Sequence, residues 1–404
     1  MSKLCIVIAP SGFKESLSPE QAADAIAEGI KRAAPGARII KVPLVDGGEG
    51  FTETLVSATR GQMRKVKVTG PVGDAVESYF GFIGKESIHS GDDNLDDKQS
   101  QKRVAVMEMA AAAGLRLVPK DRRDPLQTTT RGVGELIRHA LDEKAERILV
   151  GCGDSGTNDG GAGAAASLGV KLLKADGSPI GDGAAALDEL DRIDISERDK
   201  RLDDVQIDVA CNIHNILCGE QGVARVFGPQ KGASQETVEK MERSLERYAE
   251  IIKRDTGTDV RLMPGGGASG GLGAGLHALL DATLHQRYEV VMEYLEIDEV
   301  LKRADLVFTS EGGLDFQTSR GKIPVEVATR AKRLGLPVIA IAGTVGKGAD
   351  LNFEHGIDAM FSMLPKPCTL EEAIEQARPM LAKCAENVMR TVMLSMAMAD
   401  KRRG

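Results

Sequence analysis

Near the start of the chain, two apolar runs flank a stretch with the periodicity of a helix, which is a β-α-β order. Residues 3–9 and 39–44 are apolar runs of strand length. Between them, Ser18, Pro19 and Gln21 have the spacing of a capped helix start, and the apolar positions that follow keep a 3.6-residue period. This order predicts parallel strands joined by right-handed crossovers.

The same alternation returns toward the end of the chain, but the middle differs. Residues 65–69 and 77–83 flank a Pro-Val-Gly-Asp turn and predict an antiparallel hairpin. We therefore predict an α/β fold with two unlike domains. One is a doubly wound, Rossmann-like domain with a parallel sheet, built from residues 1–65 and 295–404. The other, residues 66–294, is an inserted α/β domain with a mixed sheet.

Several local predictions concern segments near the candidate sites. Residues 306–309 predict a strand that ends in a loop over 310–322, and residues 370–398 predict one C-terminal helix. Residues 88–102 are polar and charge-mixed, which predicts an exposed loop. A helix is expected over 132–141, with a threonine as its N-cap.

The stretch most indicative of chemistry begins with an apolar run at residues 148–150. It continues as a glycine-rich loop over residues 151–163, which carries Asp154, Asn158 and Asp159. Small ligands usually bind where chain leaves the carboxyl end of a strand in an α/β sheet. Glycines let a backbone approach a ligand closely, and carboxylates among them suggest a metal ion or a proton transfer.

The same loop matches a dinucleotide fingerprint, Gly151-x-Gly153-x-x-Gly156, with Asp176 about 20 residues further on. This match favours an NAD-dependent dehydrogenase as one alternative. Two observations weaken it. Gly160 and Gly161 would fall in the first turns of the expected helix, and the same expression recurs from Gly265 without a clear preceding strand.

A second glycine cluster, Ser269-Gly270-Gly271-Leu272-Gly273, precedes an apolar helical stretch. Free N–H groups and the helix dipole at such a helix start favour a phosphate group. The alternative is a close approach of two helices that the missing side chains permit.

Three loops place carboxylates among glycines directly after apolar strands: Asp46 with Glu49, Asp154 with Asp159, and Glu311 with Asp315. A single such loop is an ordinary capped turn. Three of them are the parts that phosphoryl transfer requires, namely carboxylates for Mg²⁺ and for a hydroxyl proton, with cations and backbone amides around the phosphate. The chain has no Walker A loop, no nucleophile elbow and no histidines at metal-ligand spacing.

Composition narrows the class of protein. The 404 residues carry a net charge of −8 and are 42% apolar but only 3% aromatic, which supports a full core and argues against a nucleic-acid partner. No apolar run is long enough for a membrane span, and the first residues lack the pattern of a secretory signal. The six cysteines are scattered without C-x-x-C spacing. We expect a soluble, reduced, cytoplasmic protein that is a monomer or a homodimer.

Seven motifs occur in order along residues 3–380. They are APSGFKES from Ala9, DGGEG from Asp46, TRGVGE from Thr130, TNDGG from Thr157, FGPQKG from Phe227, GLGAG from Gly271 and EGGLDFQT from Glu311, the last followed by Arg320-Gly-Lys322. Together they resemble the bacterial type I glycerate kinase family. The resemblance implies ATP- and Mg²⁺-dependent phosphorylation of D-glycerate to 2-phosphoglycerate, by two unlike α/β domains with the active site between them.

The resemblance assigns roles to the loop residues. Asp46 and Asp159 are candidates for the base or for Mg²⁺ ligands. Three cations, Lys14, Arg131 and Lys322, are expected to hold the substrate carboxylate or the phosphates. For Lys14 the alternative is a solvated loop lysine. The expected catalytic residues are Lys14, Asp46, Asn158 and Asp159; the expected substrate- or phosphate-binding residues are Arg131, Thr157, Ser269, Gly270, Gly271, Asp315 and Lys322; the expected metal ligands are Glu49 and Glu311.

The chain also departs from that family's usual pattern inside these loops. A related hydroxy acid is therefore an alternative substrate, and a non-catalytic hydroxy-acid-binding homologue is an alternative function. The family usually has Asp at Ser11, Ser at Gly12, Gly at Asp154, acids near Asn212 and His214, Gly at Ser310, Arg at Gly313 and Gly at Phe316.

Overall fold

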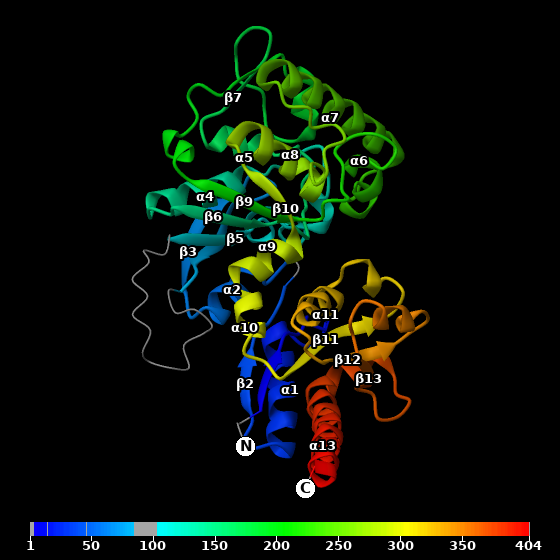
Figure 1. Ribbon diagram of the computed structural model, residues 1–404. Helices are drawn as coiled ribbons and strands as arrows, with labels where there is room; N and C mark the ends of the chain where they lie inside the picture. Colours follow the sequence, from blue (N-terminus) through cyan, green and yellow to red (C-terminus); the bar gives the residue numbers. More distant parts are fainter. Residues whose placement is uncertain (1–3, 14, 46, 85–102, 404) are drawn as a thin grey trace. The chain divides into compact units, whose positions relative to one another are not determined.

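The computed structural model describes residues 4–13, 15–45, 47–84 and 103–403. Its contacts divide the chain into two compact units (Figure 1). Unit 1 contains the described residues up to Val45 and from Val291 onward, and unit 2 contains those in between. The first division therefore falls before the expected boundary at residue 65. That the two units are separately folding domains stays a prediction.

Unit 1 is built on a five-stranded, all-parallel sheet in the order β13-β12-β11-β1-β2. Helices α1 and α13 pack side by side over the face that carries Ile6 and Ile8 (Figure 1), and α11 packs against β11 and β12. The elements are β1 Cys5–Ile8, α1 Pro19–Ala33, β2 Arg38–Lys41, α10 Ile297–Leu301, β11 Leu306–Leu314, α11 Ile323–Arg333, β12 Val338–Val345, β13 Ala359–Ser362, α12 Leu370–Glu375 and α13 Ala377–Arg403.

Unit 2 is built on a six-stranded mixed sheet in the order β10-β9-β6-β5-β4-β3, and β7 pairs with β8 separately. Strands β5, β6, β9 and β10 are parallel, whereas β3-β4-β5 are antiparallel. Its strands are β3 Gln62–Thr69, β4 Ala75–Phe82, β5 Val104–Glu108, β6 Arg147–Gly151, β7 Lys171–Leu173, β8 Arg192–Asp194, β9 Gln206–Cys211 and β10 Thr283–Gln286. Its helices are α2 Phe51–Ala58, α3 Ala110–Ala113, α4 Arg131–Asp142, α5 Ala162–Ser167, α6 Val223–Phe227, α7 Gln235–Thr256 and α8 Ala268–Leu280, while α9 Arg287–Tyr294 runs across the division.

These two sheets confirm the predicted fold class, with one parallel and one mixed sheet. The hairpin of β3 and β4 and the helix start at Ser18 are also confirmed. The Ser18 hydroxyl accepts the Gln21 N–H, and the Gln21 side chain accepts the Ser18 N–H, which completes a capping box. Helix α2 belongs with unit 2, because it packs against β3, β4 and β5.

Two local predictions are wrong. Strand β11 continues through Leu314, because Glu311 to Leu314 pair with Ala342 to Val345 of β12 in spite of their glycines. The C-terminal segment forms two helices, α12 and α13. Pro379 lacks an N–H and its ring disfavours a continuous helix through the preceding turn, so the chain breaks at Gln376. The loop expected over 88–102 lies outside the described residues.

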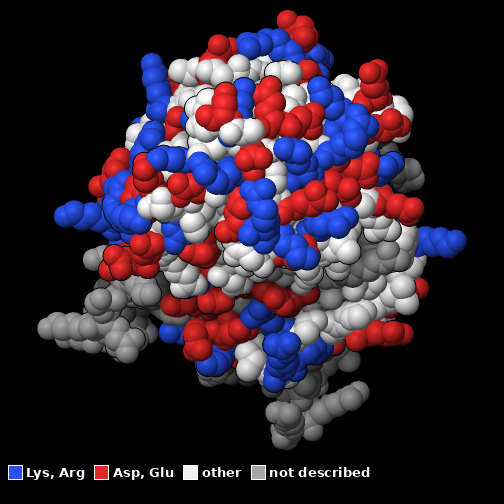
Figure 2. Space-filling view, turned by 90° about the horizontal axis from the view of Figure 1, so that it is seen from above, with Lys and Arg blue, Asp and Glu red and all other residues white. Residues whose placement is uncertain are grey.

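Charged side chains of both signs are interspersed over the face shown in Figure 2. Helix α7 illustrates the pattern, since lysines and arginines alternate with glutamates along its sequence. A mixed surface of this kind lacks the single-sign stripe by which nucleic-acid-binding domains hold phosphates. None of the helices in the described part of the chain has the length and apolar character that crossing a bilayer requires.

The close approach of α1 and α13 generates a stability prediction. A Cβ added at Gly29 would lie 2.1 Å from the Ala382 carbonyl oxygen and 2.8 Å from the Glu386 nitrogen. Alanine normally favours a helix interior over glycine. We nevertheless expect Gly29→Ala to lower the free energy of unfolding by about 1–3 kcal/mol, the usual effect of overpacking.

Thermal and urea denaturation of the purified variant measure this effect. Gly36→Ala is the matched control, since a Cβ at Gly36 meets no atom within 4 Å. A Gly29→Ala protein as stable as the wild type would show that α13 moves away from α1 at little cost.

Candidate functional site

The loop that follows β6 lies at the carboxyl edge of the unit 2 sheet. Strands β5, β6, β9 and β10 all end at this edge because they are parallel. Residues 152–161 connect β6 to α5 without regular secondary structure, yet most of them are buried. Their backbone polar groups therefore require partners from elsewhere in unit 2.

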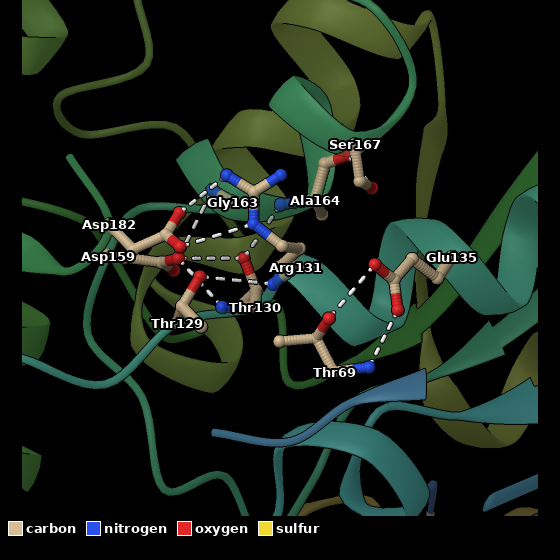
Figure 3. A network of polar contacts seen from close by, with 10 residues as sticks. All are labelled: Thr69, Thr129, Thr130, Arg131, Glu135, Asp159, Gly163, Ala164, Ser167 and Asp182. Atoms are coloured by element: carbon tan, nitrogen blue, oxygen red, sulfur yellow. Dashed lines mark hydrogen bonds and ion pairs between the residues drawn. The ribbon is translucent and has the colours of Figure 1, made fainter. Parts of the chain in front are cut away.

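Asp159, near the end of this loop, accepts hydrogen bonds from the starts of α4 and α5 (Figure 3). Its side chain is fully buried, and it accepts hydrogen bonds from the Thr130 N–H at 2.8 Å and the Thr130 hydroxyl at 2.9 Å. It also accepts the N–H groups of Gly161 and Gly163 at the start of α5. Burial raises the pKa of the Asp159 carboxyl, and these hydrogen bonds act against that rise. All four donors belong to the protein, so this geometry favours a positioning role over that of a base.

Thr130 has a different role from the expected N-cap. It occupies the N-cap position of α4, but its hydroxyl caps no N–H of that helix. The hydroxyl instead donates to Asp159 and accepts the Ala164 N–H of α5, so it links the starts of two helices (Figure 3). Arg131, expected to bind a carboxylate or phosphate, holds the Asp182 carboxylate through two bonds of 2.9 and 3.2 Å. Both side chains are partly exposed, so an incoming anion can reach the guanidinium only in competition with Asp182.

Lys231 is a residue that the sequence did not single out. Its ammonium group is buried and donates to the Ser155 hydroxyl, the Thr157 carbonyl and the Asn158 side-chain oxygen at 2.6–2.9 Å. Burial lowers the pKa of Lys231 to about 7, and the nearby Asp159 carboxylate partly opposes this shift. The FGPQKG motif contains this lysine, but nothing in a sequence marks which lysine is buried.

Two further expected residues, Thr157 and Asn158, lie beside this ammonium group. Both are fully buried, and neither the Thr157 hydroxyl nor the Asn158 side-chain nitrogen has a hydrogen-bond partner among the described residues. The same holds for the Tyr248 hydroxyl, and a Cβ at Gly160 would lie 2.5 Å from the Tyr248 ring. Buried polar groups of this kind usually meet water or a ligand.

The glycine cluster of α8 packs against this loop. Ser269, Gly270 and Gly271 all have positive φ angles, and a Cβ at Gly270 would lie 1.8 Å from the Thr157 carbonyl oxygen. The Gly270 carbonyl accepts the Gly160 N–H at 3.0 Å. At Gly270 and Gly271 the missing side chains therefore permit a close approach of the loop after β6, where the alternative to a phosphate site had expected a second helix. A phosphate-binding role for these residues and for Ser269 stays a prediction.

Two acidic residues, one buried and one exposed, lie beside the start of α2. The buried Glu108 carboxylate, at the end of β5, accepts the N–H groups of Gly50 and Thr52 and the Tyr79 hydroxyl, and burial raises its pKa. It thereby fixes the start of α2. Glu49, immediately before, points to Arg116 and forms an ion pair at 2.5 Å. Sequence reasoning missed Glu108 and Arg116, because neither stands in a glycine-rich loop.

Unit 1 has its own carboxyl edge. The chain passes from β1 through α1 to β2 on one side, and from β11 through α11 to β12 on the other. The order of strands therefore reverses between β1 and β11, and ligands of open α/β sheets bind at this point. Here the Ser11 N–H donates to the Ser310 carbonyl at 2.8 Å. The Ser310 hydroxyl is buried and has no hydrogen-bond partner among the described residues.

Glu311, Asp315 and Lys322, expected to bind metal, substrate or phosphate, gather at this edge of unit 1. Lys322 and Glu311 form an ion pair at 3.6 Å, with both side chains partly exposed. Asp315 accepts the Gln317 N–H at 2.8 Å, the bond of an ordinary capped turn. The two expected residues Lys14 and Asp46 lie outside the described residues.

Comparison with known proteins gives a consistent result. The model of the glycerate kinase family matches residues 6–393. A glycerate kinase of Halalkalibacterium halodurans is 48% identical over 95% of this chain and 97% of its own length. A glycerate 2-kinase of Escherichia coli is 44% identical, with 97% and 98% covered. The crystal structure of a protein assigned as glycerate kinase 2 from Salmonella typhimurium LT2 superimposes with a TM-score of 0.84, at 44% identity and with 97% and 99% covered.

The chain belongs to the glycerate kinase family. The resemblance drawn from its loops is thus confirmed, and with it the class of phosphotransferases with an alcohol acceptor.

The structure does not supply the context that the dehydrogenase alternative requires. In a dinucleotide fold the fingerprint opens a helix, but α5 begins only at Ala162, well after Gly156. The Asp176 carboxylate accepts the N–H and hydroxyl of Ser178 in an exposed turn. No strand precedes the second match at Gly265 within the described residues 257–267. Both matches are therefore glycine patterns with another structural role.

The buried ammonium of Lys231 generates a pH prediction. In the folded protein its proton is lost near pH 7, whereas in the unfolded chain it is kept to about pH 10.4. Between these values the unfolded state binds more protons, so the free energy of unfolding rises with pH. The variant Lys231→Met lacks this titration. We expect the stability difference, wild type minus variant, to rise by up to about 1.4 kcal/mol per pH unit above pH 7.

Urea denaturation at several pH values between about 6.5 and 9.5 measures this difference. The exposed Lys240→Met variant controls for the general effect of removing a lysine. A difference that does not change with pH over this range would mean that Lys231 keeps its proton throughout.

Proposed function

We propose that this protein transfers the terminal phosphoryl group of ATP to a hydroxyl of D-glycerate, giving 2-phosphoglycerate and ADP. The observation that carries the proposal is the similarity over nearly the whole chain to proteins named glycerate kinase and glycerate 2-kinase. The family model, which matches residues 6–393, spans the loops at the carboxyl edges of both sheets. An expected cytoplasmic location, and a monomeric or homodimeric state, stay predictions.

The described residues fit a Mg²⁺-dependent reaction. No three His, Cys, Asp or Glu side chains among them form a metal-binding group. Kinases, however, hold Mg²⁺ through one or two carboxylates, with phosphate oxygens and water as the other ligands. The partly exposed carboxylates of Glu49 and Glu311 can each supply such a ligand in their own unit. When bound, the ion neutralises charge on the phosphates.

The protein's own residues divide into those that face solvent and those that hold the loops. Arg116 and Lys322 are cations that now pair with Glu49 and Glu311, so they are available to anions that displace these partners. Asp159, surrounded by protein donors, we assign to holding the loop after β6. Asp46, which lies outside the described residues, stays the proposed base for the substrate hydroxyl on the strength of the DGGEG motif.

A direct assay tests the proposed reaction. ADP release is measured by coupled assay with ATP, Mg²⁺ and a panel of three- and four-carbon hydroxy acids, and the product is identified by ³¹P NMR. We expect D-glycerate to give the highest kcat/KM and the phosphorus signal of the 2-phosphate. Faster turnover of another acid would assign a different substrate. Tight binding without any ADP release would instead support a non-catalytic homologue.

A substitution tests the role of Glu49. Removing a carboxylate that binds the metal or the reacting hydroxyl removes an interaction made in the transition state. We therefore expect Glu49→Gln to lower kcat by at least about a hundredfold. Glu53→Gln is the matched control, because Glu53 is exposed on the first turn of α2. Steady-state kinetics at several Mg²⁺ concentrations give the result, and equal kcat values for the two variants would exclude Glu49 from the chemistry.

A further inference from the structure

Asp154 has a backbone conformation that is rare for its residue type. Its φ angle is +50°, in the left-handed region. Side chains with a Cβ are strained there, and glycine, asparagine and aspartate are the residues that tolerate it best. The residue lies at the carboxyl edge of the unit 2 sheet, three residues after the end of β6, and it is exposed.

The left-handed backbone accompanies a contact between two distant segments. The Asp154 carboxylate accepts the Glu49 N–H at 3.0 Å, and the Asp154 carbonyl accepts the Leu115 N–H at 2.9 Å. Gly153 lies against the same segment, since a Cβ there would be 2.7 Å from the Gly48 Cα. An aspartate in a turn usually bonds to a backbone N–H two residues further on, but this one bonds to a segment far away in the sequence.

The Glu49 residue is consequently held at both of its ends. Asp154 holds its N–H, and Arg116 pairs with its carboxylate at 2.5 Å. The next residues are fixed by Glu108, which accepts the N–H groups of Gly50 and Thr52. Arg116 is 82% exposed, so its contribution is weakened by solvent and salt. The hydrogen bond that the Glu49 N–H donates to Asp154 is therefore the more specific constraint on where the Glu49 backbone lies.

We propose that Asp154 is a positioning residue that orders the backbone from which the Glu49 carboxylate projects, because Asp154 accepts a hydrogen bond from the Glu49 N–H. The inference rests on the proposed function, in which Glu49 contacts the metal or the reacting hydroxyl. Asp154 itself needs no contact with a substrate. Its contribution is that Glu49 keeps one orientation before the ligands arrive, which reduces the ordering required at binding.

Three substitutions separate the left-handed backbone from the hydrogen bond. Asp154→Asn keeps both, because asparagine tolerates positive φ and its side-chain oxygen accepts the same N–H. Asp154→Gly keeps the backbone and loses the acceptor. Asp154→Ala loses the acceptor and adds strain. The Gly and Ala variants therefore differ only in strain, and the Asn and Gly variants differ in the acceptor.

Two readouts are expected to follow the acceptor. Hydrogen–deuterium exchange, resolved to the Glu49 amide by mass spectrometry with fragmentation, is about tenfold faster in the Gly variant and close to wild type in the Asn variant. The kcat at saturating ATP, Mg²⁺ and D-glycerate falls about tenfold in the Gly variant, as expected for one lost hydrogen bond, and stays within about threefold in the Asn variant. The KM for ATP changes little in either. The melting temperature falls in the Ala variant, whereas the Gly variant stays near wild type.

The outcomes that overturn the proposal are distinct. If the Glu49 amide exchanges as slowly in the Gly variant as in the wild type, the hydrogen bond to Asp154 does not order this segment. A kcat in the Asn variant as low as in the Gly variant would show that the acceptor is not the property that matters. If the wild type releases no ADP with any hydroxy acid, the proposed function fails. Hydrogen exchange at the Glu49 amide then still tests the contact: faster exchange in the Gly variant means that Asp154 holds Glu49, and unaltered exchange means that it does not.

Discussion

A buried chain without regular secondary structure is the constraint on which the rest of unit 2 depends. Residues 152–161 leave β6 and cross over α8 so closely that Gly270 and Gly271 admit no side chain. Backbone groups in such a place are costly unless they are hydrogen-bonded. Asp159 accepts the N–H groups of Gly161 and Gly163 where this loop enters α5, and the Lys231 ammonium group donates to the Thr157 carbonyl and to the Asn158 side-chain oxygen. The nearby Asp159 carboxylate also favours the charged form of Lys231.

Burial separates two kinds of acidic residue that look alike in the sequence. Glu108 and Asp159 are buried, and each accepts backbone N–H groups at the start of a helix, where a carboxylate also interacts favourably with the helix dipole. Glu49 and Asp154 lie at the surface of the same edge. The buried pair fixes the loops, and the exposed pair is what a ligand can reach. Carboxylates among glycines in the sequence therefore indicate where the carboxyl edge of the sheet lies. Whether each carboxylate holds a loop or faces solvent is known only from the fold.

The sequence predicted the fold well because its signals are local. The alternation of apolar runs and the capping box at Ser18 depend on neighbouring residues, and both sheets follow from them. Strand β11 was cut short because Gly312 and Gly313 suggest a turn, whereas pairing with β12 overrides that preference. Lys231 was missed because its ammonium group is buried against Ser155, Thr157 and Asn158 of the loop after β6, which is far from it in the sequence. Contacts between distant residues leave no periodic pattern in the sequence. Residue types and spacing therefore indicated the candidate loops, but not the residues whose side chains fix those loops in place.

Asp154 shows how a side chain can occupy a backbone position that favours glycine. A residue without Cβ adopts a φ angle of +50° freely. Aspartate is among the few residues that tolerate the same backbone. At this position its carboxylate also accepts the Glu49 N–H, which a glycine could not do. A side chain in a site loop therefore need not contact a substrate, because its first effect here is on the order of the residue beside it.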